Sequence, residues 1–326
     1  MNKVLKEYWL LILIGVLLIC GSVYFVIEDN SGKIAGKKES GNDVVFAIGE
    51  ENVTADEFYD ELYQSYGTAG IYQFMLKAVA EASYETTNEM KENAKLYAEN
   101  VKASYMNSYG GSYETYLVSD LLALGYDSVD DLADYFVNYQ KTMNFLVETV
   151  TSDEEGTWAN YAEENKPRVV SHILVKMADP ENPTEEELAK VADVEAALAN
   201  GDDFGTVAST YSDDSSAATQ GLLGYADANT SYVEEFLTAM LALNEGETTD
   251  WVKTEYGYHL IKCDSTSLDY FTENYKEDML NAVLSYDPTV QPRAVWAKAQ
   301  QLGISFTDET VKTDLMNYMG LESEGE

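Results

Sequence analysis

The sequence predicts an α+β protein, and two patterns along the chain carry that prediction. Residues 54–165 place apolar side chains at helical spacing over most of their length. From Arg168 to Asp264 the pattern changes to a strand, helices, a loop, a helix and further strands, which is typical of an α+β domain of about a hundred residues. An apolar run near the N-terminus stands apart from both regions and predicts one membrane-spanning helix.

The composition excludes some classes of protein and permits a large core. The chain has 326 residues, with 20 Lys and Arg against 58 Asp and Glu, which gives a formal net charge of -38. Such a chain is repelled by phosphate backbones, so a nucleic-acid partner is excluded. Hydrophobic residues make up 45% and aromatic residues 12% of the chain, which is enough for a packed core. Two cysteines, Cys20 and Cys263, exclude a disulfide framework.

About 20 uncharged, mostly apolar residues extend from Tyr8 to Ile27. A helix of that length reaches about 30 Å, the thickness of the hydrocarbon layer. A cleaved signal peptide is one alternative, but no A-x-A-like site follows directly after Ile27. Lipoprotein processing at Cys20 is another; Leu17 resembles the bacterial lipobox, whereas Ile19 is bulkier than that site prefers. We expect an uncleaved transmembrane anchor at residues 8–27.

The charges beside this run set its expected orientation. Lys3 and Lys6 precede it, and positive flanks tend to stay in the cytoplasm. Residues 1–7 are therefore expected to be cytoplasmic, with the body on the extracytoplasmic side of the cell membrane. Residues 28–42 have linker composition and would hold the body away from the membrane.

The segment at residues 43–166 opens with a predicted strand at Val44–Ile48 and a turn at 49–52. Thr54 and Glu57 form a predicted capping box that starts a helix. Helical spacing predicts further helices at residues 71–82, 89–109 and 130–150. Tyrosines in this segment either line a groove for unfolded chains or, as tyrosines more commonly do, cover core and half-buried helix faces: Tyr63, Tyr66, Tyr72, Tyr105, Tyr109, Tyr113 and Tyr116.

The second segment begins with a predicted strand at Val169–Val175. Thr184 and Glu187 supply another capping box. The helices expected here lie at residues 188–198, 204–211 and 236–243, and a strand-bearing stretch follows at 251–263.

The C-terminal part is predicted to return to helices. They are expected at residues 270–286 and 292–302, with a break at Asp287 and Pro288. Ile304–Phe306 reads as a short strand that pairs with Val44–Ile48, and the tail at 322–326 is expected to fray.

Five short blocks follow one another in order between about Arg168 and Asp264. They are Ser171–Val175, Phe204–Asp213, Gly221–Gly224, Gly246–Glu247 and Tyr256–Ile261. In sequence and spacing these blocks resemble the parvulin family of peptidyl-prolyl isomerases.

The segments that flank this match in the sequence carry a second resemblance. Residues 44–59 and 271–306 are similar to the discontinuous foldase domain of PrsA-like extracytoplasmic proteins. The resemblance implies a parvulin domain at 167–264, with a small antiparallel sheet and surrounding helices. That domain would be inserted between foldase parts at 43–166 and 265–320.

The chain has only two histidines, His172 and His259, and both occupy parvulin histidine positions. The resemblance implies that they lie side by side on adjacent strands in a network with Thr254 and form the floor of the proline site. Asp214 falls where parvulins place a Cys or Asp that faces the substrate carbonyl. Even so, a purely structural role for the pair, holding the floor rigid, stays open.

The resemblance also implies an apolar pocket for the proline ring. Leu223 and Phe236 match its apolar positions, whereas Tyr232 stands where a methionine is more usual. A tyrosine is stiffer and carries a hydroxyl, so the pocket would be narrower. For Leu223 and Phe236, ordinary core packing is the alternative. The reaction needs no cofactor, metal or covalent nucleophile, because it only twists an amide whose resonance sets a barrier of about 18–20 kcal/mol.

The predicted function is a peptidyl-prolyl isomerase and foldase for unfolded secreted polypeptides that contain X-Pro bonds. Phosphate-directed parvulins carry an arginine cluster after the first strand, whereas here Asp179 and Glu181 follow Lys176 and would repel phosphoserine. The alternatives are a holdase chaperone with a weak or inactive parvulin domain, and a scaffold for other envelope proteins. Homo-oligomerisation is left open.

Overall fold

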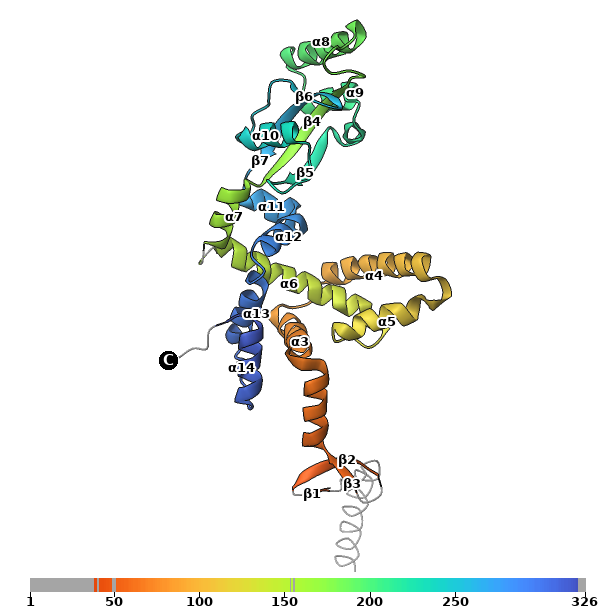
Figure 1. Ribbon diagram of the computed structural model, residues 1–326, viewed down its shortest axis with the longest axis vertical. Helices are drawn as coiled ribbons and strands as arrows, with labels where there is room; N and C mark the ends of the chain where they lie inside the picture. Colours follow the sequence, from red (N-terminus) through yellow and green to blue (C-terminus); the bar gives the residue numbers. More distant parts are fainter. Residues whose placement is uncertain (1–37, 40, 49–50, 153, 155, 322–326) are drawn as a thin grey trace, which may run out of the picture. The chain divides into compact units, whose positions relative to one another are not determined.

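The computed structural model describes residues 38–39, 41–48, 51–152, 154 and 156–321 (Figure 1). The predicted anchor at Tyr8–Ile27, the predicted cytoplasmic residues 1–7 and the predicted frayed tail at 322–326 lie outside them. Within the described ranges, no helix has both the length and the apolar character needed to cross a membrane. The chain divides into two units, residues 1–71 and 72–326.

A small antiparallel sheet opens the first unit. Its strands pair in the order β1-β2-β3: β1 (Lys38–Glu39), β2 (Asn42–Ile48) and β3 (Glu51–Thr54). The strand predicted at residues 44–48 is confirmed. At the end of the predicted linker at 28–42, Glu39 of β1 pairs with Asn42 of β2. The predicted turn at 49–52 ends early, because β3 starts at Glu51.

The predicted capping box starts helix α3 (Ala55–Ser83). The backbone N–H of Thr54 donates to Oε2 of Glu57 at 2.8 Å, and the N–H of Glu57 donates to Oγ1 of Thr54 at 3.3 Å. These bonds satisfy amides that have no partner within a helix. The helix is interrupted at Gly67, whose φ of +63° and ψ of -174° are not helical.

The second unit is mainly helical outside its own sheet, as the spacing at 54–165 predicts. Before the sheet come α4 (Asn88–Tyr109), α5 (Tyr113–Ala123), α6 (Leu132–Ser152) and α7 (Thr157–Asn165), with the 3-10 turns η1 (Gly110–Ser112) and η2 (Val129–Asp131). After the sheet come α11 (Leu268–Asn274), α12 (Lys276–Tyr286), α13 (Val290–Gln301) and α14 (Glu309–Tyr318).

Two predictions for the C-terminal part are wrong. The single helix predicted at 270–286 is broken at Tyr275, where φ is -138°. The ring of Tyr275 lies over β5 (Leu222–Ala226): a Cβ placed on Gly224 would be 3.4 Å from it, so a tertiary contact overrides helical spacing. Residues 304–306 form no strand; instead, Phe306 stacks on Trp296 of α13 with ring centroids 6.1 Å apart.

The helices before and after the sheet of the second unit pack against each other. Helix α6 contacts both α12 and α13. The hydroxyl of Tyr286 donates to Glu164 at 2.9 Å, and Nζ of Lys298 pairs with Glu148 at 3.1 Å. Segments on either side of the sheet in sequence are therefore joined in space.

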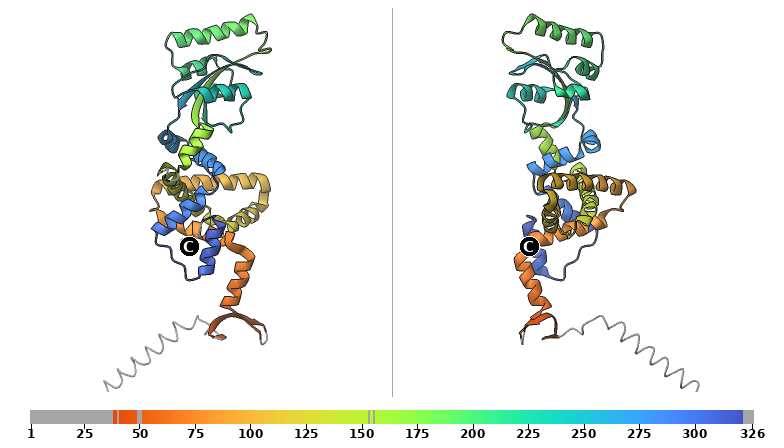
Figure 2. Two further views of the ribbon diagram at one scale, coloured as in Figure 1. Left: turned by 60° about the vertical axis from the view of Figure 1, so that its left-hand side comes forward. Right: turned by 90° about the vertical axis from the view of Figure 1, so that its right-hand side faces the viewer.

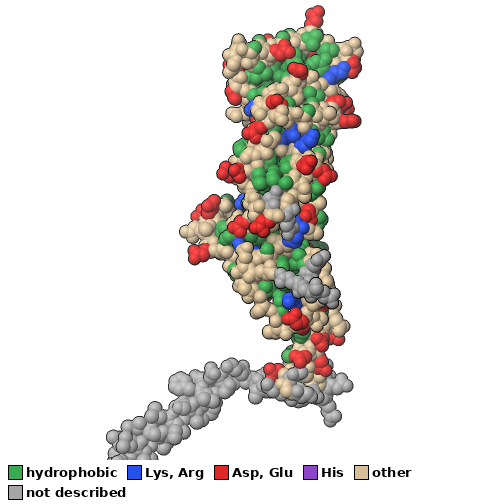
Figure 3. All heavy atoms as spheres, turned by 90° about the vertical axis from the view of Figure 1, so that its left-hand side faces the viewer, with side chains coloured by type: hydrophobic (Ala, Val, Ile, Leu, Met, Phe, Trp, Pro, Cys, Tyr) green, Lys and Arg blue, Asp and Glu red, His purple; other side chains and the backbone are tan. Residues whose placement is uncertain are grey.

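The tyrosines singled out above take different environments. Tyr72 is buried, whereas Tyr109 and Tyr116 are half exposed and stack on each other with centroids 4.3 Å apart. Acidic side chains are spread along the face shown in Figure 3, in keeping with the net charge of -38.

The sheet of the second unit has four antiparallel strands in the order β5-β4-β7-β6. They are β4 (Arg168–Lys176), β5 (Leu222–Ala226), β6 (Val252–Thr254) and β7 (Gly257–Ser265). The helices around them are α8 (Glu185–Ala199), α9 (Phe204–Tyr211) and α10 (Glu234–Ala242), with the 3-10 turn η3 (Ser215–Thr219) (Figure 2). The capping box predicted for α8 is present at Thr184 and Glu187.

Each face of this sheet has its own apolar core. Ile173 and Val175 of β4 pack with α8 and α9, whereas Val170 packs with Ile261 and with Phe236 of α10. Because successive side chains of a strand point to opposite faces, His172 falls on the α10 side. The α+β class predicted from the sequence is thus confirmed.

Candidate functional site

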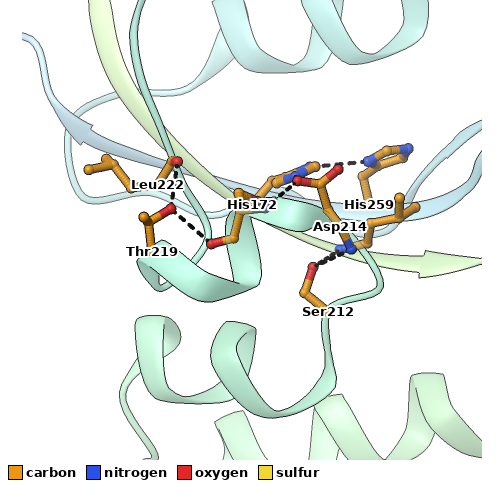
Figure 4. A network of polar contacts seen from close by, with 8 residues as sticks. His172, Ser212, Asp214, Thr219, Leu222 and His259 are labelled. Carbon is orange, nitrogen blue, oxygen red and sulfur yellow. Dashed lines mark hydrogen bonds and ion pairs between the residues drawn. The ribbon is translucent and has the colours of Figure 1, made fainter.

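The two histidines lie together on the α10 face of the sheet. In the β4–β7 register, His172 is opposite Ile261 and His259 is opposite Leu174, so the two are diagonal neighbours on adjacent strands. Their rings stack at 21° with centroids 5.5 Å apart, and the two Nδ1 atoms are 3.4 Å apart (Figure 4). Both residues are buried, with 5% of their surface exposed.

Thr254 completes the network on the far side of His259. Its hydroxyl lies 2.8 Å from Nε2 of His259, and Thr254 itself is buried at the end of β6. Gly257 makes the tight β6–β7 connection possible: its φ is +139°, and a Cβ there would lie 2.2 Å from the carbonyl oxygen of Val175.

A loop brings Asp214 to His172 because β4 has a free edge there. Strand β5 pairs only with residues 168–171 of β4. Beyond them, the N–H of His172 donates to the carbonyl of Gly221 at 2.8 Å, and the N–H of Asp213 donates to the carbonyl of Leu174 at 2.7 Å.

These bonds place Oδ2 of Asp214 at 3.3 Å from Nε2 of His172 (Figure 4). The alignment does not meet hydrogen-bond geometry, so this contact is electrostatic.

The protonation states follow from the surroundings. Burial lowers the pKa of His172, against the opposing effect of Asp214. Burial and the neighbouring His172 lower the pKa of His259 to about 4. Burial alone would raise the pKa of Asp214, but the hydrogen bond from the backbone N–H of Ser216 and the neighbouring His172 outweigh it and lower the pKa to about 2. At neutral pH the site therefore holds two uncharged imidazoles and one carboxylate.

Only one arrangement of protons suits all of these contacts. An N–H at Nε2 of His172 faces the carboxylate of Asp214, so Nδ1 of His172 is left as an acceptor. Nδ1–H of His259 then donates to it, and Nε2 of His259 accepts from the hydroxyl of Thr254. With the proton on Nδ1 of His172 instead, the lone pair of Nε2 would face the carboxylate of Asp214 and be repelled by it.

Apolar side chains cover the histidine pair. The ring of Phe236 meets both imidazoles edge-on, with centroids 5.6 Å from His172 and 5.3 Å from His259. Tyr232 packs on Phe236 at 4.9 Å, and Leu223 joins the same cluster. Phe236 is buried, whereas Leu223 and Tyr232 are partly exposed and present apolar surface to solvent. The structure therefore brings all seven predicted site residues into one region.

Sequence reasoning missed two residues that position this region. Arg168 is buried, and its guanidinium donates to the carbonyls of Met240 and Leu243, which fixes the C-terminal end of the helix that carries Phe236. The hydroxyl of Ser212 accepts the N–H groups of Leu174 and Asp214. Arg168 lies just before the first recognised block and Ser212 lies within the second, but the sequence gives no sign of these bonds.

No metal centre emerges in the part of the chain that the structure describes, because no three His, Cys, Asp or Glu side chains are grouped to hold an ion.

The matched family agrees with this geometry. A family profile described as "Rotamase: PPIC-type PPIASE domain" matches residues 172–265, which contain both histidines, Thr254 and Asp214. The sheet, its helices and the histidine pair thus form a parvulin-type peptidyl-prolyl cis-trans isomerase domain, and the chain is an isomerase of this class.

Full-length relatives extend the comparison beyond this domain. Foldase protein PrsA 3 of Bacillus cereus is 34% identical over 237 residues, covering 72% of this chain and 73% of that protein. Foldase protein PrsA of Pediococcus pentosaceus is 28% identical over 290 residues, covering 86% and 90%. The crystal structure of PrsA from Bacillus subtilis covers 84% of this chain and 98% of its own, with 25% identity and a TM-score of 0.40. The chain belongs to the PrsA foldase family.

Proposed function

We propose that His172, His259, Thr254 and Asp214 form the catalytic network of this isomerase, and that Leu223, Tyr232 and Phe236 hold the proline ring. The observation that carries this proposal is the contact of one buried phenyl ring, Phe236, with both imidazoles. An apolar wall thereby lies directly against a polar chain that ends in a carboxylate.

The proposed chemistry uses this contrast. A planar X-Pro amide carries more negative charge on its carbonyl oxygen than the twisted amide does, because twisting removes resonance. An ionised Asp214 next to that oxygen destabilises the planar state more than the twisted one. The neutral histidines keep the floor rigid and dry, so this effect is weakly screened.

Asp214→Asn in the full chain tests this assignment. Asn is a similar N-cap, so the bond from the N–H of Ser216 (2.8 Å) to this side chain, and with it η3, should persist while the charge is lost. We expect kcat/KM for a chromogenic X-Pro peptide to fall about tenfold, or about 1.4 kcal/mol, in a protease-coupled assay. Unchanged kcat/KM would show that Asp214 only caps the turn.

Tyr232 supports a second candidate, a holdase whose isomerase domain is catalytically weak. Its ring packs on Phe236 and narrows the space beside the histidines. Tyr232→Met should then raise kcat/KM, whereas equal rates in the two proteins would remove this argument.

We further propose that the protein is tethered by residues 8–27 and that its body assists secreted chains outside the cytoplasmic membrane. The proposed domains are 43–166 and 265–320 for the foldase parts and 167–264 for the isomerase. The contacts of α6 with α12 and α13 support joining the two foldase parts. Mass spectrometry of the mature N-terminus tests the anchor, because cleavage or lipidation at Cys20 would overturn it.

A further inference from the structure

Two neighbouring cavities lie away from the isomerase site, where helices α6 and α12 pack together. One has a volume of about 580 Å³ and the other about 310 Å³. Both are lined by Tyr139 and Met143 of α6, so these two side chains form their shared boundary. We call the two cavities together the α6–α12 trough.

The larger cavity combines acidic and aromatic side chains. Its carboxylates come from the N-terminal turn of α4 and from the α11–α12 junction: Glu89, Glu273, Glu277 and Asp278. Its aromatic rings are Tyr97, Tyr139 and Tyr275.

These carboxylates are exposed, and within the described part of the chain none of them is in an ion pair. The cation in this cavity is Lys276, whose Nζ is held at 3.2 Å by Asn144.

The charge of these carboxylates contributes to raised pKa values of tyrosines that line the cavity. Burial, with Glu277 as a further cause, raises the pKa of Tyr139 to about 12. Burial also raises the pKa of Tyr275, to which Asp278 contributes. Tyrosine faces and carboxylates together suit a Lys or Arg side chain, through cation–π attraction and charge-assisted hydrogen bonds.

The smaller cavity is mostly apolar. Leu76, Leu124, Leu146 and Leu284 line it together with the shared Met143. Its lysine, Lys77, is already engaged by the carbonyl of Gly125 at 2.8 Å and the ring of Tyr126 at 4.1 Å. This cavity therefore suits an apolar side chain.

We infer that the α6–α12 trough binds an unfolded polypeptide segment that carries a basic and an apolar residue close together in sequence. Along α12, Glu277 and Leu284 are about 10 Å apart at 1.5 Å per residue. An extended chain covers about 10 Å in three residues, so the basic and apolar side chains are about three positions apart. Volumes of this size accommodate a few side chains and exclude a folded domain.

This site is distinct from the isomerase site and adjoins its domain. Tyr275 of the larger cavity also lies against Gly224 of β5, the neighbour of Leu223. A segment held in the trough would therefore start beside the isomerase domain. Binding there requires no proline and does not depend on the proposed catalytic roles.

Fluorescence anisotropy with the full chain tests the inference. The probe is a fluorescein-labelled, proline-free peptide with Lys and Leu three positions apart in a Gly-Ser background. The double variant Glu277→Gln and Asp278→Asn should weaken its binding at least fivefold. The matched control is Glu185→Gln with Glu186→Gln, which removes two exposed charges from the first turn of α8. It should change binding less than twofold.

Each outcome decides the matter. Equal weakening by both double variants would mean attraction to the net charge alone, and no weakening by the first would mean that the trough is not the site; either result overturns the inference. A peptide with Glu in place of Lys should bind at least tenfold more weakly to the unmodified chain. His259→Ala should leave binding unchanged, so that loss of isomerase activity and loss of the trough are told apart.

Discussion

The proposed isomerase site and the proposed α6–α12 trough have different physical requirements within one unit of the chain. At the proposed isomerase site, two uncharged imidazoles are buried under Phe236 and fixed by a hydrogen-bonded strand register. In the trough, exposed carboxylates lie beside tyrosines that are half-buried or exposed. Changing the rotation rate of an amide requires a rigid, dry surface, whereas holding varied chains requires accessible charge and adaptable apolar contacts.

The largest expected effect concerns the proposed isomerase site. Phe236→Ala removes a buried ring that contacts both histidines, and the cavity left behind should lower the free energy of unfolding by about 3–5 kcal/mol. Isomerase activity should fall to the buffer rate.

Phe74→Ala is the control, because Phe74 is 62% exposed. Urea unfolding followed by tryptophan fluorescence measures both variants. A loss below about 1 kcal/mol for Phe236→Ala would mean that the apolar cover is not needed for the site.

The next largest effect is expected from removing the hydrogen bond between Thr254 and His259. Thr254→Val keeps the shape and the strand propensity but leaves Nε2 of His259 buried without its donor. An unsatisfied buried group costs about 1–3 kcal/mol, so we expect kcat/KM to fall about 10- to 100-fold.

Binding of the proline-free probe peptide to the trough should not change in this variant. Thr238→Val, on the exposed face of α10, is the matched control. A Thr254→Val protein as active as the control would contradict the network.

These tests touch what the sequence predicted well. The resemblance to parvulins placed His172, His259 and Thr254 together, and in the structure the β4–β7 register holds the two histidines as neighbours on one buried face. The sequence does not reveal the role of Arg168, because its hydrogen bonds depend on where the C-terminal end of α10 lies in space. The predicted helix through Tyr275 and the predicted strand at Phe306 are wrong for a related reason. Tyr275 packs on Gly224 and Phe306 packs on Trp296, and the spacing of apolar residues does not reveal such contacts.

The trough could not be predicted at all. Its walls come from helices far apart in the sequence, and no motif links Glu89 with Glu277. Acidic residues in the first turn of a helix are common for electrostatic reasons, so the sequence alone gives them a structural explanation. Only the shared boundary at Tyr139 and Met143 reveals a common site.

A third prediction concerns acid. The pKa of His259 is about 4 in the folded chain and about 6.5 when unfolded, so the unfolded chain binds the extra proton between these values. Stability from this group is complete above pH 6.5 and is lost as the pH falls toward 4. Between pH 7 and pH 5 the free energy of unfolding should drop by about 2 kcal/mol more in the unmodified chain than in His259→Gln.

Urea titrations at the two pH values measure this difference. The comparison with His259→Gln is needed because the high net negative charge also responds to acid. Asp214 does not interfere, since its pKa of about 2 places its loss of stability below pH 4. Parallel loss in both proteins would mean that His259 titrates normally.

The smallest predicted effect is a difference in salt dependence between peptide binding at the trough and isomerisation. Raising the ionic strength from about 0.05 to 0.5 M shortens the Debye length to a few ångströms, which weakens attraction between exposed charges. Binding of the Lys-Leu probe to the trough should weaken several-fold, because Glu277 and Asp278 are exposed. Isomerisation of an uncharged X-Pro peptide should change by less than about 1.5-fold, because the carboxylate of Asp214 is partly buried, 3.3 Å from the ring of His172, where salt screens its charge less. If isomerisation were as salt-sensitive as binding, the two regions would not differ in screening, and the contrast between a dry catalytic surface and a wet holding surface would fail.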